Sequence, residues 1–107
     1  ILSKLSDVLA ERKAIPPVKP SYVVNLLRGG TIRIGSKVLE EAAEVIEAGT
    51  EPGDAGREHL VKEAADLVFH TMVMLTHRDV PWSAVEAELG RRFGIGGIEE
   101  KQSRGTT

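Results

Sequence analysis

The stretch from Ala64 to Leu75 constrains the fold most, because it is apolar on nearly every side of the helix that its pattern predicts. Only Asp66, His70 and Thr71 interrupt it. At about 100° per residue, Glu63, Asp66 and His70 fall on one narrow stripe. A helix of this kind is buried, so other helices must surround it, and we expect two carboxylates to lie inside that packing.

A second set of carboxylates lies in the stretch 37–48, which predicts an amphipathic helix. Glu40, Glu41 and Glu44 occupy its polar side, and carboxylates three residues apart share one helix face. Together with the later pair they form the pattern E-E-x-x-E … E-x-x-D. Hard cations such as Mg²⁺ prefer a shell of oxygen ligands. The pattern therefore predicts a site for Mg²⁺, with Mn²⁺ as an alternative ion, whose ligands are Glu41, Glu44, Glu63 and Asp66.

Simpler interpretations remain for each half of this pattern. The stretch 37–48 alone equally fits a solvated helix face. Glu63 and Asp66 could instead pair with Lys62 or an arginine. We expect His70 to hydrogen-bond within the site, or to be a satisfied core histidine, rather than to ligate the metal.

The rest of the chain predicts an all-α bundle of four to five helices in a single domain, residues 1–107. Glycine and proline separate the helical segments, and the stretch 50–56 predicts a surface connector. Ser21 and Ser36 are candidate N-caps. The predicted helices span residues 3–13, 22–28, 37–48, 57–77 and 81–93.

Composition excludes several classes of function. The net charge of −2 argues against a nucleic-acid partner. No run approaches the ~20 apolar residues of a membrane span, and the first residues lack a signal-peptide pattern, so we expect a cytoplasmic protein without a membrane partner. The absence of cysteine excludes disulfides and thiolate zinc sites.

The glycine-rich tail, residues 94–107, allows two interpretations. Lys101 and Arg104 are three residues apart and could both reach a phosphate group. A frayed terminus with scattered charge is the commoner explanation.

These residues resemble the all-α NTP pyrophosphohydrolase superfamily and, within it, the phosphoribosyl-ATP pyrophosphatase family of histidine biosynthesis. The carboxylate pattern is specific only to the superfamily, while the beginning and the end of the chain narrow the resemblance to this family. The matching residues are Ser21-Tyr22, Leu27, Gly30, Lys37-Val38, Glu40-Glu41-Ala42, Glu44, Glu63-Ala64-Ala65-Asp66-Leu67, Phe69-His70, Glu88-Leu89-Gly90-Arg91-Arg92, Gly97-Ile98-Glu99-Glu100-Lys101 and Ser103-Arg104.

The resemblance implies Mg²⁺-dependent hydrolysis of the α–β phosphoanhydride of phosphoribosyl-ATP, a nucleotide substrate, to phosphoribosyl-AMP and pyrophosphate. Glu40 would join the four predicted ligands as a catalytic residue that orients a ligand or the attacking water, or it would form a surface salt bridge. Arg91 and Arg92 could instead only supply favourable charge at a helix C-terminus. The implied substrate-binding residues are Lys37, His70, Arg91, Arg92, Lys101 and Arg104.

Four positions depart from the family pattern without removing a carboxylate. Threonine, lysine, glycine and tyrosine are common where this chain has Val23, Ser36, Leu39 and Phe69. Because cysteine is absent, the chain cannot carry the zinc site of the cyclohydrolase that is fused to this family in some organisms.

One subunit is small for so large a substrate, so we expect a homodimer that completes the bundle, as the resemblance also implies. The alternative is a monomer with a partly exposed patch at Met72 and Leu75. Two other functions remain in play: a house-cleaning pyrophosphatase for dNTPs or modified NTPs, and a non-catalytic helical dimerisation module.

Overall fold

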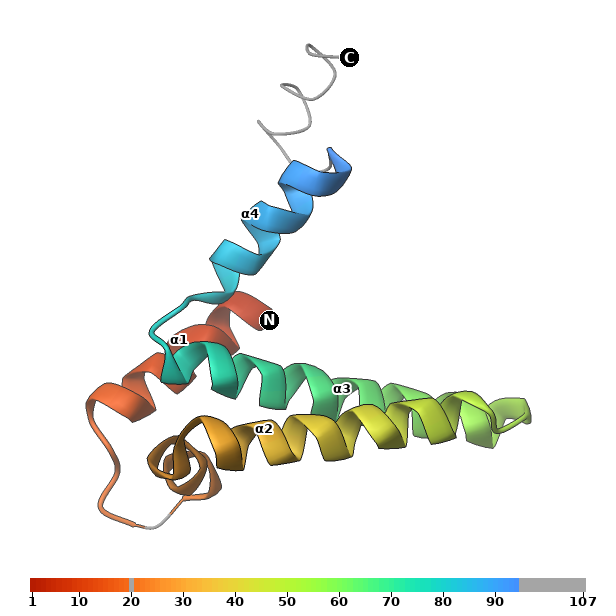
Figure 1. The fold of residues 1–107 in the computed structure, drawn as a ribbon, viewed down its shortest axis with the longest axis horizontal. Coiled ribbons are helices and arrows are strands. Elements are labelled where there is room, and N and C mark those ends of the chain that lie inside the picture. The colour runs from red at the N-terminus through yellow and green to blue at the C-terminus, as the bar shows by residue number, and fades with distance from the viewer. Residues whose placement is uncertain (20, 95–107) are drawn as a thin grey trace.

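The computed structural model describes residues 1–19 and 21–94, which form four helices and no strand (Figure 1). The two long helices, α2 (Tyr22–Gly49) and α3 (Gly53–His77), pack side by side as an antiparallel hairpin. Helix α1 (Leu2–Ala14) crosses one end of this hairpin, and α4 (Trp82–Phe93) leads away from it after packing against α1. The predicted all-α fold is confirmed.

A kink at Gly30 divides α2 into two parts. The predicted break at Gly29-Gly30 is confirmed, because the backbone of Gly30 is not helical, but the helix resumes directly after it, so the predicted connector up to residue 36 was wrong. Gly30 has φ 76° and ψ −169°, a conformation that glycine adopts without a Cβ penalty. The part before it runs across the hairpin, where Figure 1 shows it nearly end-on. Ser36 lies inside the helix and is not an N-cap.

The other helix boundaries agree with the expected ones to within a few residues. Ser21 caps α2, since its side chain accepts a hydrogen bond from Val24 N–H at 3.3 Å. Helix α3 begins at Gly53, four residues earlier than predicted, so the connector shrinks to residues 50–52. Gly94 ends α4 in the left-handed conformation, with φ 64°.

The hydrophobic core lies where α1, the kinked part of α2 and the C-terminal half of α3 meet. Its buried members are Leu9, Val23, Leu26, Ile34, Met72 and Val73. The earlier part of α3 is different, because Val61 is 68% exposed and Ala65, Asp66 and Val68 are exposed as well. The predicted burial of residues 64–75 therefore holds only for the later part of that stretch. No helix among residues 1–19 and 21–94 is long and apolar enough to cross a membrane.

Candidate metal centre

Three of the four predicted ligands converge between α2 and α3. Glu41 and Glu44 project from α2 and Glu63 from α3, and each offers one carboxylate oxygen within 4.8 Å of the other two. Helical spacing explains the first pair, since residues three apart lie on one face. The antiparallel packing of α3 against α2 brings the third. The hairpin thus brings together carboxylates that lie far apart in the sequence.

Two oxygens of this group are buried without a hydrogen-bond partner among the described residues. They are Oε2 of Glu41 and Oε2 of Glu63, and the whole Glu41 residue is only 7% exposed. A buried carboxylate oxygen without a partner is costly unless a cation neutralises it. The donor set, oxygen only and negatively charged, suits Mg²⁺ or Mn²⁺.

The pKa values of the group are raised, which shows that its ionised form is unfavourable without a cation. Burial raises the pKa of the Glu41 carboxyl, and the neighbouring charges of Glu44 and Asp66 raise it further. The pKa of Glu63 rises from 4.5 to about 7, because the facing carboxyl of Glu44 favours its protonated form, and burial and the repulsion of nearby carboxylates raise the pKa further. A divalent cation would relieve this repulsion, because it binds the ionised forms.

Asp66 lies beside the group rather than within it. Its charge is close enough to raise the pKa of both Glu41 and Glu63. It is nevertheless exposed in this chain, whereas we expected it to be enclosed by the helix packing. Its position fits a ligand at the open side of the group, and that role stays a prediction.

His70 is fully engaged by the protein. Its Nδ1 lies 2.7 Å from the backbone carbonyl of Asp66, which can only accept, so Nδ1 carries the proton. Nε2 then accepts from the Tyr22 hydroxyl at 2.7 Å. With 5% exposure, His70 is a satisfied buried histidine that ties the kinked part of α2 to α3. Neither ring nitrogen is free for metal or substrate in this arrangement.

Glu40 and Lys37 pair with each other at the surface. Lys37 Nζ donates to Oε2 of Glu40 at 3.0 Å, and this contact raises the pKa of the lysine. The Glu40 side chain is 53% exposed. The salt bridge that we considered for Glu40 is present, while contact of either residue with substrate stays a prediction.

Two contacting residues were not singled out from the sequence. His59 lies one helical turn before Glu63, and its Nε2 is 3.4 Å from Oε1 of that glutamate. Its Nδ1 donates to both carboxylate oxygens of Glu51 at 3.0 and 3.1 Å. The spacing of four residues between His59 and Glu63 was the available signal. The contact between His59 and Glu51 joins α3 to the connector, and helical periodicity does not predict such a contact.

The predicted arginines lie on a different part of the molecule. Arg91 and Arg92 both bind Glu88 within α4, at 2.7 and 2.6 Å, and hold its pKa down at about 2. This helix packs against α1 at the opposite end of the molecule from the α2–α3 connector (Figure 1). The described chain therefore does not bring these arginines to its own carboxylates. Lys101 and Arg104 lie outside the described residues.

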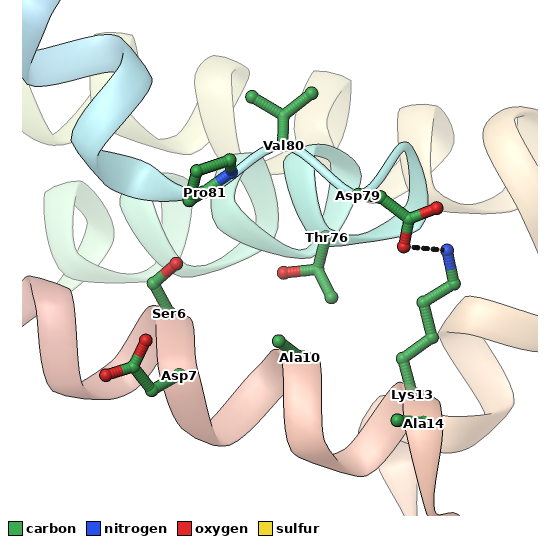
Figure 2. A pocket seen from close by; sticks show the side chains of 9 residues that line it. All are labelled: Ser6, Asp7, Ala10, Lys13, Ala14, Thr76, Asp79, Val80 and Pro81. Carbon is green, nitrogen blue, oxygen red and sulfur yellow. Dashed lines mark hydrogen bonds and ion pairs between the residues drawn. The ribbon is translucent and has the colours of Figure 1, made fainter.

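A cavity of about 510 Å³ lies away from the carboxylates, between α1 and the turn that joins α3 to α4 (Figure 2). Lys13 closes one side of it through an ion pair with Asp79 at 2.7 Å. Ser6 lines another side, where its hydroxyl accepts the backbone N–H of Trp82 at 3.1 Å. Asp7, which also lines the cavity, is exposed. Among the described residues, the cavity therefore contains no buried unpartnered oxygen like those of Glu41 and Glu63.

Comparison with known proteins gives a consistent result. The sequence model of a family described as phosphoribosyl-ATP pyrophosphohydrolase matches residues 2–93. A protein from Rhodopirellula baltica named phosphoribosyl-ATP pyrophosphatase is 46% identical over 96% of this chain and 85% of its own length. A protein of the same name from Novosphingobium aromaticivorans is 48% identical over 97% of this chain and 94% of its own length. A Neisseria meningitidis protein with that name is 44% identical, with the same two coverages.

Proposed function

The chain belongs to the phosphoribosyl-ATP pyrophosphohydrolase family, and we propose that Glu41, Glu44, Glu63 and Asp66 bind the metal of its active site. The enzyme hydrolyses phosphoribosyl-ATP at the α–β phosphoanhydride, which yields phosphoribosyl-AMP and pyrophosphate, a step of histidine biosynthesis. The observation that supports the metal site best is the pair of buried, unpartnered oxygens on Glu41 and Glu63.

The chemistry requires neutralisation of the polyphosphate charge and a positioned water. Bound Mg²⁺ would supply a Lewis acid for the phosphate oxygens. The carboxylates would hold that ion between α2 and α3. Glu40, next to Glu41 in the chain and with a 53% exposed side chain, would orient the attacking water. Lys37 lies one turn from Glu41 and could exchange its contact with Glu40 for a phosphate oxygen.

We also propose that the enzyme is a homodimer. Leu39 and Ile46 are seven residues apart on one face of α2 and are 74% and 71% exposed. Val61 and Val68 repeat this spacing on α3 and are 68% and 36% exposed. Two helices with bare apolar faces are typical of a bundle that a second copy completes. The patch that we considered for a monomer is absent at Met72, which is 1% exposed.

A dimer would also change the surroundings of Asp66, which is exposed in the single chain. It could bring Arg91, Arg92 and the tail of one copy to the carboxylates of the other. We further propose that the enzyme works in the cytoplasm, because its substrate is a phosphorylated intermediate of amino-acid biosynthesis.

The test is release of pyrophosphate from phosphoribosyl-ATP with Mg²⁺, compared with dCTP, dUTP and ATP under the same conditions. The proposal expects hydrolysis of phosphoribosyl-ATP that stops when Mg²⁺ is chelated and resumes when it is restored. Preferred hydrolysis of dCTP or dUTP would instead favour a house-cleaning pyrophosphatase. Turnover that continues unchanged with a chelator would contradict the metal site.

A further inference from the structure

The two carboxylate oxygens of Glu63 have different surroundings, because one of them contacts His59. Nε2 of His59 lies 3.4 Å from Oε1 of Glu63. The other oxygen, Oε2, is buried, has no hydrogen-bond partner among the described residues, and belongs to a side chain that is only 14% exposed. A carboxylate held at one oxygen has fewer rotamers and presents the other oxygen in a fixed direction.

The ring of His59 is itself held from its far side. Nδ1 donates to both oxygens of Glu51, at 3.0 and 3.1 Å, so the imidazole cannot rotate freely. Glu51, His59 and Glu63 thus form a continuous chain from the connector to the carboxylate group. His59 and Glu51 are 40% and 39% exposed, which places this chain at the rim of the site.

Glycine at position 56 brings Glu51 close enough to take part. A Cβ at Gly56 would collide with the backbone carbonyl of Glu51, so the connector can lie against the first turns of α3 only because this residue has no side chain. The connector is also fixed by Glu51 N–H, which donates to the carbonyl of Ala48 at 3.2 Å. The contact with His59 therefore follows from an ordered turn.

We propose that His59, held by Glu51, is a positioning residue that aims Oε2 of Glu63 at the metal ion. This inference rests on the proposed metal site and adds two residues that support it from outside. Partners behind metal ligands commonly orient them, and their loss weakens metal binding by about 10- to 100-fold.

The test measures Mn²⁺ binding to the full chain by the electron paramagnetic resonance signal of the free ion. His59→Ala should raise the Mn²⁺ dissociation constant about tenfold, since Glu63 loses its restraint. His59→Gln should stay within about threefold of wild type, because the amide nitrogen of glutamine can reach the place of Nε2. Glu51→Ala should weaken binding in the same direction as His59→Ala. Glu58→Ala, at an exposed neighbouring position on α3, is the matched control and should leave the constant unchanged.

A second readout separates positioning from folding. With phosphoribosyl-ATP, the Mg²⁺ concentration for half-maximal rate should rise about tenfold in His59→Ala, in line with its metal affinity. Without metal, the thermal midpoint of His59→Ala should stay close to that of wild type, because the restraint on Glu63 acts on metal binding rather than on folding. An unchanged Mn²⁺ dissociation constant in His59→Ala would overturn the proposal, and so would a His59→Gln variant as weak as His59→Ala.

The outcomes also distinguish this inference from the proposed function. If wild type binds no Mn²⁺, both the proposed metal site and the proposed role of His59 are contradicted. If wild type binds Mn²⁺ and His59→Ala weakens it, but phosphoribosyl-ATP is not hydrolysed, the positioning role stands and the catalytic assignment falls.

Discussion

Glu41 on α2 and Glu63 on α3 each bury one carboxylate oxygen, Oε2, that no hydrogen bond satisfies in the described part of the chain. The charge of Glu41 contributes to the upward shift of the pKa of Glu63, which reaches about 7. The metal-free protein thus carries repulsion at the point where its two long helices pack. This relationship gives the first prediction.

Without metal, the free energy of unfolding should fall as pH rises from about 4.5 to about 7. The Glu63 carboxyl has a pKa of 4.5 when unfolded and about 7 when folded, so the unfolded chain releases its proton first across this window. Below the window both states are protonated and there is no penalty. Thermal unfolding in a chelator at several pH values measures the slope, and saturating Mg²⁺ should reverse much of it above pH 7.

Two other titrations set the controls for that experiment. Glu88, with a pKa of about 2, loses its stabilising contact with Arg91 only below pH 4.5, so it acts in a separate window. The contact with Glu51 raises the pKa of His59 above 6.5. The stability that this contact contributes is therefore lost as pH rises above 6.5, near the upper end of the Glu63 window. The raised pKa of Glu41 adds a slope of the same sign as that of Glu63. Glu63→Gln should therefore reduce the slope between about pH 4.5 and 7, and an unaltered slope in that variant would reject the assignment to Glu63.

The Tyr22 and His70 contact should stabilise the kinked part of α2. Tyr22→Phe keeps the edge-on ring packing, with centroids 5.8 Å apart, but removes the hydroxyl that donates to buried Nε2. The expected loss is about 1 kcal/mol in the free energy of unfolding, measured by urea denaturation. A double-mutant cycle with His70→Ala should show coupling between the two sites. Additive effects would mean that the hydrogen bond contributes no stability.

The exposed apolar faces of α2 and α3 predict a dimer of twice the 11.6 kDa chain mass. Ile46→Asp should shift the mass in light scattering toward that of one chain, because burial of the introduced charge is costly. Glu47→Asp, at the adjacent exposed position, is the control. A monomeric wild type, or an Ile46→Asp variant with wild-type mass, would place the interface elsewhere.

The tail gives a prediction about substrate binding. Lys101→Ala/Arg104→Ala should lower kcat/KM for phosphoribosyl-ATP by a factor on the order of 10², if each residue makes a charge-assisted hydrogen bond to phosphate. The neighbouring pair Gln102→Ala/Ser103→Ala should have little effect. Equal kinetics for all three proteins would leave the tail without a role in binding and would favour a more general nucleotide pyrophosphatase.

Helical periodicity was enough to predict which carboxylates meet. Glu41 and Glu44 share a face because they are three residues apart, and Glu63 joins them once α3 packs against α2. The same rule could not show which side of α3 the neighbouring helix covers. Asp66 therefore shares the predicted stripe and is nevertheless exposed in the single chain.

The early start of the helix after Gly30 and the contacts across the α2–α3 connector could not be predicted from the sequence pattern. Gly29-Gly30 predicted the break, but the pattern did not show that the helix resumes directly after Gly30, where Ile34 is buried at 0% exposure. Glu51 reaches His59 through the close approach that Gly56 permits. Such a contact depends on the path of a turn, which neither a period of 3.6 nor residue composition specifies.

The most direct test of the metal centre is one variant, Glu41→Gln, measured for both stability and turnover. Removing a buried charge while keeping the side-chain volume should raise the thermal midpoint in chelator, because repulsion at Glu44 and Asp66 is relieved. The same variant should lose the stabilisation by Mg²⁺ and lose roughly 10² or more in the rate of pyrophosphate release from phosphoribosyl-ATP. A Glu41→Gln protein that keeps wild-type turnover and the wild-type Mg²⁺ shift would contradict the account.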